Sequence, residues 1–65
     1  MQVLINQRPH TLPAGATLAD AVAAAQASGP FATAVNLRFV PKSHYASTPL
    51  AEGDQIEIIA PVTGG

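Results

Sequence analysis

The sequence predicts an α+β roll in which one main helix lies across a mixed sheet of four to five strands. Two short alternating segments open the chain, an alanine-rich segment follows, and more strand-like segments come after it. Apolar residues at every second position indicate strands, whereas apolar residues three and four apart indicate a helix. A hairpin, a helix and a returning set of strands, in that order, predict an α+β fold.

Residues 1–5 alternate between two faces, as expected of a half-buried strand. Asn6-Gln7 is expected to form a tight turn, because Asn tolerates the left-handed backbone that two-residue hairpins require. A second strand over 8–12 would return beside the first. Pro9 has no N–H to donate, so it should lie at the start of that strand or on an outer edge.

The helix is predicted over 18–27, where alanine, the best helix former, predominates. Thr17 is a favourable N-cap, and Asp20 three residues later completes a capping box with Asp in place of Glu. Gly29-Pro30 supply a left-handed stop and a residue that cannot continue the helix.

The second half of the chain contains shorter elements. A third strand is predicted over 34–37, and a continuation or fourth strand over 39–41. Residues 43–48 are expected to form a turn or a single helical turn. The last strand is predicted over 55–60, before a flexible tail over 61–65.

The first and last strands are expected to pair in parallel at the centre of the sheet, because the helix between them supplies the long crossover that parallel pairing needs. This strand order describes a ubiquitin-like β-grasp domain over 1–60.

Composition excludes several classes of protein. The chain has 65 residues, no cysteine, three basic residues and a formal net charge of −1. A disulfide scaffold and cysteine chemistry are therefore excluded, and three scattered cations do not form a nucleic-acid surface. No apolar run reaches the ~18 residues of a membrane span, and the N-terminus does not resemble a signal peptide. We expect a cytoplasmic protein without nucleic-acid or membrane partners.

Side-chain catalysis finds little support in the sequence. A metal site or a catalytic base would need more than His10 and His44, which we expect to be exposed. The acids suit a helix cap, a turn and a strand face rather than paired acid–base work: Asp20, Glu52, Asp54 and Glu57. We therefore expect neither an enzyme nor a bound cofactor or metal.

The distinctive feature is the terminal pair Gly64-Gly65. A C-terminal carboxylate is ionised and unreactive at neutral pH, so it becomes an acyl donor only after activation, for example as an anhydride with AMP. Glycine lets the backbone pass through a narrow active site, while Pro61, Val62 and Thr63 would keep the base of the tail extended.

With this fold and tail, the sequence resembles the thiamine-biosynthesis sulfur carriers of the ThiS family. Five segments, spread over nearly the whole chain, carry the resemblance: 1–6, 35–36, 40–42, 50–59 and 62–65. The Val40-Pro41-Lys42 step and the length favour this family over the small subunit of molybdopterin synthase.

The resemblance implies a mechanism in which Gly65 is the site. An adenylating enzyme of the ubiquitin-activating type would use ATP and magnesium to form an acyl-adenylate on Gly65. Sulfur from the persulfide of a cysteine desulfurase would then convert it to a thiocarboxylate, which delivers sulfur to thiazole synthase. The carrier would be a co-substrate.

Partner enzymes require a docking surface. Leu4 and Ile59 are predicted to point away from the core on neighbouring strands, and we expect them, with Lys42, to form part of it.

Three alternative functions stay open. The chain could carry sulfur in another pathway, such as molybdopterin synthesis or tRNA thiolation. It could be a ubiquitin-like modifier joined to target lysines through Gly65, or an interaction domain in which Gly64-Gly65 is incidental.

Overall fold

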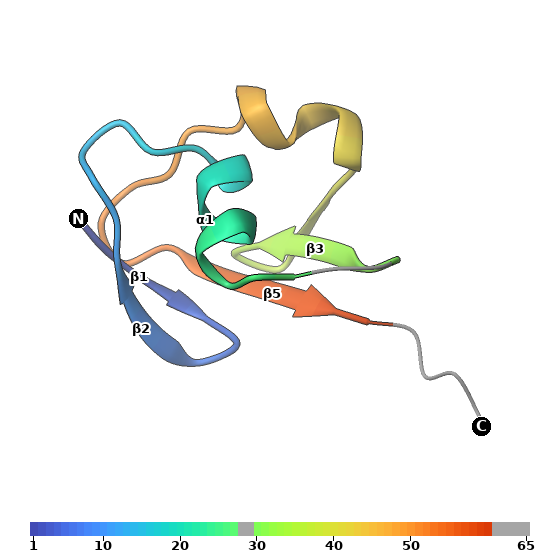
Figure 1. The fold of residues 1–65 in the computed structure, drawn as a ribbon, viewed down its shortest axis with the longest axis horizontal. Helices are drawn as coiled ribbons and strands as arrows, with labels where there is room; N and C mark the ends of the chain where they lie inside the picture. The colour runs from blue at the N-terminus through green and yellow to red at the C-terminus, as the bar shows by residue number, and fades with distance from the viewer. Residues whose placement is uncertain (28–29, 61–65) are drawn as a thin grey trace.

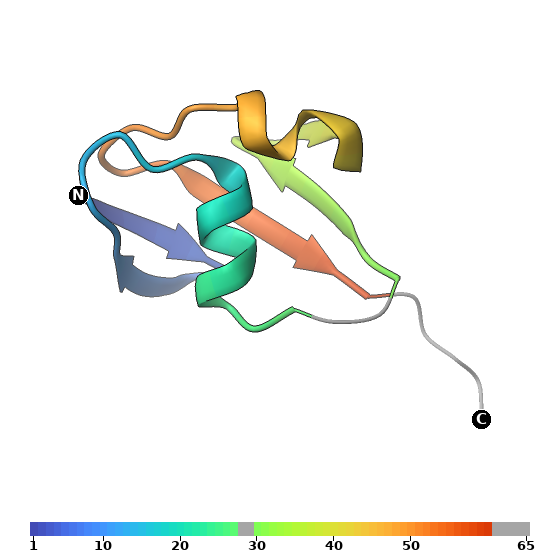
Figure 2. The ribbon, with the colours of Figure 1, turned by 45° about the horizontal axis from the view of Figure 1, so that its top comes forward.

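The computed structural model describes residues 1–27 and 30–60. These residues form a single sheet with strand order β2-β1-β5-β3-β4. Helix α1 and the 3-10 helix η1 lie on the same side of this sheet (Figures 1 and 2). The predicted α+β roll with a mixed sheet is confirmed. The elements, in chain order, are β1 (Gln2–Ile5), β2 (Arg8–Thr11), α1 (Leu18–Ala24), β3 (Ala32–Val35), β4 (Arg38–Val40), η1 (Lys42–Ser47) and β5 (Gln55–Ile59).

The centre of the sheet is the parallel pair β1 and β5, in which Leu4 lies opposite Gln55 and Ile5 opposite Ile56. The other strand pairs are antiparallel. The predicted central pairing of the first and last strands is therefore confirmed. Pro9 lies on β2, an edge strand, where its missing N–H costs no ladder hydrogen bond.

Both hairpins turn through two residues with positive φ. Asn6 and Gln7 have φ of 50° and 67°, and Asn36 and Leu37 have φ of 50° and 70°. The first turn was predicted. The third strand, predicted over 34–37, is present but spans Ala32–Val35, so its predicted end is wrong. Strand β3 ends at Val35, because Asn36 and Leu37 adopt the left-handed conformation that matches the twist of a tight hairpin.

Helix α1 begins as predicted and ends earlier. The Thr17 N–H donates to Asp20 Oδ2 at 2.8 Å, which confirms the carboxylate half of the capping box. The helix ends at Ala24 rather than at residue 27, because Gln26 adopts a left-handed φ of 56°. Gly29, one of the predicted stop residues, lies outside the described residues. Within the described chain, no helix is long and apolar enough to cross a bilayer.

The core lies between the sheet and the layer formed by α1 and η1. Val3 and Ile56 from the sheet and Leu18 from α1 are the largest fully buried apolar side chains. Thr33, the one buried polar residue among those described, forms a hydrogen bond of 2.8 Å with the Tyr45 hydroxyl. Tyr45 also stacks on Phe31, the residue before β3, so η1 has a polar contact with β3 and an aromatic contact with the segment leading into it.

Candidate functional site

The residues predicted to carry the chemistry and to enter a partner active site lie outside the described residues: Pro61, Val62, Thr63, Gly64 and Gly65. The described chain ends at Ala60, directly after β5. Strand β5 is the middle strand of the sheet, with β1 on one side and β3 on the other. Among the described residues, those nearest to the predicted site are the end of β5 and the surface around it.

Asn6 holds the end of β5 through its main chain and its side chain. Its backbone N–H donates to Ile56 O at 2.8 Å. Its side-chain Oδ1 accepts the Ile58 N–H at 2.9 Å, and its Nδ2 donates to Ile58 O at 3.2 Å. The side-chain amide thus bonds both polar groups of one residue of β5, just before the described chain ends.

Asn36 occupies the corresponding position in the second hairpin and holds the beginning of β5. Its Oδ1 accepts the Gln55 N–H at 3.0 Å, and its Nδ2 donates to Asp54 Oδ1 at 3.1 Å. The other Asp54 oxygen accepts the Ala51 N–H at 2.8 Å. Two asparagines from two hairpin turns therefore fix β5 at its two ends.

The side of the sheet opposite α1 carries exposed apolar residues, Ile59 near the end of β5 and Phe39 on β4. Ile59 is 58% exposed and pairs with Ala32, whereas Phe39 is 69% exposed and pairs with Ala34. No described helix covers this side (Figures 1 and 2). We call the positions of Ile59, Ala32, Ala34 and Phe39 the open face.

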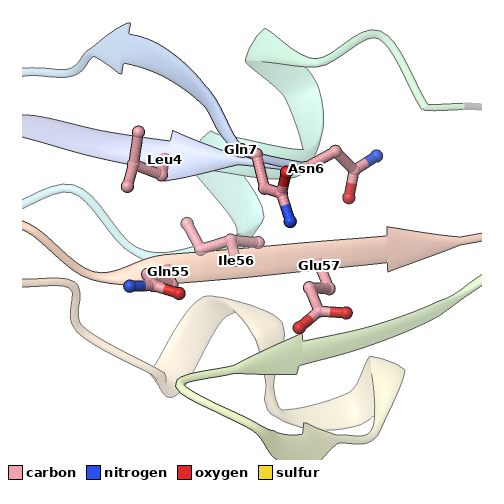
Figure 3. A pocket seen from close by; sticks show the side chains of 6 residues that line it. All are labelled: Leu4, Asn6, Gln7, Gln55, Ile56 and Glu57. Atoms are coloured by element: carbon pink, nitrogen blue, oxygen red, sulfur yellow. The ribbon is translucent and has the colours of Figure 1, made fainter.

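Leu4 lies on the same side of the sheet as Ile59, as predicted, but the two side chains are not adjacent. Leu4 pairs with Gln55, four residues before Ile59, which corresponds to about 13 Å along a strand. Leu4 is also half-buried. It contributes to a separate and more polar surface pocket (Figure 3), lined by Leu4, Asn6, Gln7, Gln55, Ile56 and Glu57.

Lys42 is exposed at the first position of η1, in the layer that also contains α1. It therefore lies outside the strand positions that form the open face. Its predicted part in docking stays a prediction.

The sequence interpretation missed Phe39 and Leu37 as surface candidates. Leu37 is 86% exposed at the tip of the second hairpin. Both were missed because the third strand was predicted to continue through residues 36 and 37. Without a turn there, Phe39 is not expected opposite Ala34. The signal was present in the first hairpin, where an asparagine also occupies the first turn position.

Most of the acids stabilise the local backbone. Glu52 accepts the Gln2 N–H at 2.9 Å, and Asp20 and Asp54 bind the backbone as described above. Glu57 differs in pairing with Ala34 on the open side of the sheet, where it is exposed. It supplies the negative charge of this surface beside the apolar open face.

The two histidines lie in different environments. His44 is exposed on η1, as predicted, whereas His10 is half-buried. His10 pairs with Val3 across the first hairpin, so it shares the side of the sheet on which Val3 packs against α1. In residues 1–27 and 30–60, no three His, Cys, Asp or Glu side chains gather closely enough to hold a metal ion.

The described elements define a ubiquitin-like β-grasp domain, a five-stranded mixed sheet with α1 and η1 on one side. The chain belongs to the ThiS family, whose family model matches residues 3–65. The predicted family is therefore confirmed, and membership supports the class of sulfur carrier for thiamine biosynthesis.

Solved structures agree with this fold. The chain is similar to the crystal structure of the thiamine biosynthesis protein ThiS from Geobacter metallireducens, with a TM-score of 0.82, 17% identity and full coverage of both chains. It is also similar to the solution structure of a thiamine biosynthesis protein from that organism, with a TM-score of 0.78, 17% identity, and coverage of 100% of this chain and 88% of the other. No curated protein matches the sequence significantly.

Proposed function

We propose that this protein carries sulfur on the C-terminal carboxylate of Gly65 for thiazole formation in thiamine biosynthesis. The observation that supports this most is the match to the ThiS family, which runs through Gly65 on a β-grasp domain. An adenylating enzyme, a cysteine desulfurase and thiazole synthase are the proposed partners. ATP and magnesium are used by the adenylating enzyme.

The proposed chemistry proceeds in balanced steps. The Gly65 carboxylate attacks the α-phosphate of ATP, giving an acyl-adenylate and releasing pyrophosphate. The terminal sulfur of a persulfide then attacks the acyl carbon and displaces AMP, which leaves an acyl disulfide. A thiol reduces that disulfide and frees the thiocarboxylate. The carrier contributes the acyl carbon and its presentation, and the partner enzymes contribute the catalytic groups.

The described residues support this role because they hold the end of β5, from which the chain continues toward Gly65. Asn6 holds the end of β5 at Ile58 by two side-chain hydrogen bonds. Ile59 offers exposed apolar surface at that end, and Phe39 offers more on β4 on the same side of the sheet. We propose that the adenylating enzyme docks on this side. Apolar and aromatic side chains at the centre of an interface provide much of its binding energy.

The test is the intact mass of the protein after incubation with the adenylating enzyme, ATP, magnesium, a desulfurase, cysteine and a reducing thiol. We expect one oxygen to be replaced by sulfur, and we expect a variant lacking Gly65 to keep its mass. An unchanged mass for the full chain, with the same enzymes active on a known carrier, would contradict the proposal.

The pathway is tested in a second step. Isolated thiocarboxylate protein is given to thiazole synthase with its other substrates. We expect thiazole formation and return of the carrier to its carboxylate form. A thiocarboxylate that thiazole synthase leaves untouched would favour a carrier role in another sulfur pathway.

A further inference from the structure

We propose that Asn6 is a positioning residue for the C-terminal end of the chain. Its side-chain amide holds Ile58 on the β1 side of β5, while β3 pairs with Ile58 and Ile59 on the other side. Together these contacts set the direction in which the chain leaves the sheet toward the proposed sulfur site. The inference rests on the proposed function, because direction matters only if the following residues must enter a partner active site. It assigns to a hairpin turn a task at the opposite end of the sequence.

The geometry explains why a side chain is needed here. The parallel ladder of β1 and β5 runs up to the bond between the Asn6 N–H and Ile56 O. At Asn6 the main chain turns away toward β2, with φ of 50°. The next residue of β5 that faces β1 is Ile58, because alternate residues of a strand direct their N–H and C=O to the same side. The Asn6 amide takes the place of the missing strand at Ile58.

The effect concerns direction more than stability. These hydrogen bonds are exposed, so water can replace them in a variant at little net cost in free energy of unfolding. Water does not fix the orientation of Ile58 relative to β1, whereas a side chain that donates and accepts at once does. Holding a segment in its productive direction raises apparent affinity, because a larger fraction of the free protein is competent to bind.

The residue type at position 6 meets two requirements. It must accept a left-handed φ, which Gly, Asn and Asp do readily. It must also present a donor and an acceptor together, which only Asn does among these three. Gly would keep the turn and lose both side-chain bonds, and Asp would set a carboxylate oxygen against the Ile58 carbonyl.

Asn36 provides the matched control. It has the same φ of 50° and also bonds β5 through its side chain, but at Asp54 and Gln55 where the strand begins. Asn36→Gly should therefore perturb a hairpin and β5 to a similar degree without affecting the end from which the chain continues.

The experiment compares wild type, Asn6→Gly, Asn6→Asp and Asn36→Gly in the full chain. Amide hydrogen exchange is measured at Ile58, with Glu57 as internal reference because it pairs with β3. Steady-state activation by the adenylating enzyme is followed as pyrophosphate release, with a desulfurase, cysteine and a reducing thiol in excess so that each acyl-adenylate is discharged. For both Asn6 variants we expect about tenfold faster exchange at Ile58, and a KM for the carrier raised about three- to tenfold with kcat within about twofold.

Three results would overturn the inference. The Asn6 variants could keep the wild-type KM although exchange at Ile58 accelerates, or Asn36→Gly could raise KM equally, which would indicate general destabilisation. Failure of wild type itself to be activated, by an enzyme active on a known carrier, would overturn the proposed function and this inference with it. The behaviour of wild type therefore distinguishes the two failures.

Discussion

The hydroxyl groups of Thr33 and Tyr45 lie 2.8 Å apart in the core and form its one side-chain hydrogen bond between described buried residues. Thr33 belongs to β3 and Tyr45 to η1, so the bond joins the sheet to the layer above it. In an interior where the other buried side chains are apolar, each hydroxyl depends on its partner, and the pair fixes where η1 packs.

This relationship predicts a non-additive pair of substitutions. Thr33→Val or Tyr45→Phe alone should lower the free energy of unfolding by about 1–3 kcal/mol, because each leaves a buried hydroxyl unpaired or removes a bond. The double variant should lose clearly less than the sum of the two. Urea denaturation of the four proteins gives the coupling, and strict additivity would show that water satisfies each hydroxyl alone.

The second hairpin predicts a substitution that stabilises the fold. Leu37 is 86% exposed and has φ of 70°, so it contributes strain and little packing. Leu37→Gly should raise the free energy of unfolding by about 1 kcal/mol, because glycine has no Cβ to oppose this conformation. Leu37→Ala is the control, since it removes the exposed side chain but keeps the strain. If Leu37→Ala raised the free energy of unfolding as much as Leu37→Gly, backbone strain would not be the cause.

The capping box at the start of α1 predicts that Asp20→Ala lowers the free energy of unfolding, whereas Asp20→Glu does not. Asp20→Ala removes the acceptor of the Thr17 N–H and should cost about 1 kcal/mol. Asp20→Glu should stay near wild type, because Glu is the usual acid of a capping box. Thermal unfolding measured by circular dichroism compares the three proteins. Equal losses for both variants would mean that the carboxylate needs the shorter side chain of Asp.

The open face predicts which surface substitutions disturb docking. Ile59→Glu and Phe39→Glu should each weaken binding to the adenylating enzyme about tenfold or more, because each places a charge in an apolar contact. Both side chains are exposed, so the fold should be retained. Ala23→Glu, on the exposed side of α1, is the matched control. Calorimetric titration measures the affinities, and unchanged values for both variants would remove this face from the proposed interface.

The helix and the central pairing were predictable because they depend on local signals and on chain connectivity. Thr17 and Asp20 indicate a helix start, because the capping hydrogen bond joins residues three apart in sequence. The parallel pairing of β1 and β5 follows from the crossover that α1 provides.

The second turn was not predicted, because Leu37 is an apolar residue in a strand-like segment and is not a typical turn residue. Its left-handed backbone is imposed by the pairing of β3 with β4 rather than by its own preference. The end of α1 was misplaced for a similar reason, since the left-handed residue is Gln26 rather than a glycine.

By itself, the sequence determined the class of fold, the family resemblance and Gly65 as the proposed sulfur site, because these are carried by periodicity, local motifs and the order of segments. Only the tertiary structure decided that Asn6 bonds Ile58, 52 positions away, and that Phe39 lies on the same side of the sheet as Ile59. Contacts between residues far apart in sequence depend on strand register, and a register change of one residue turns every side chain to the other side of the sheet.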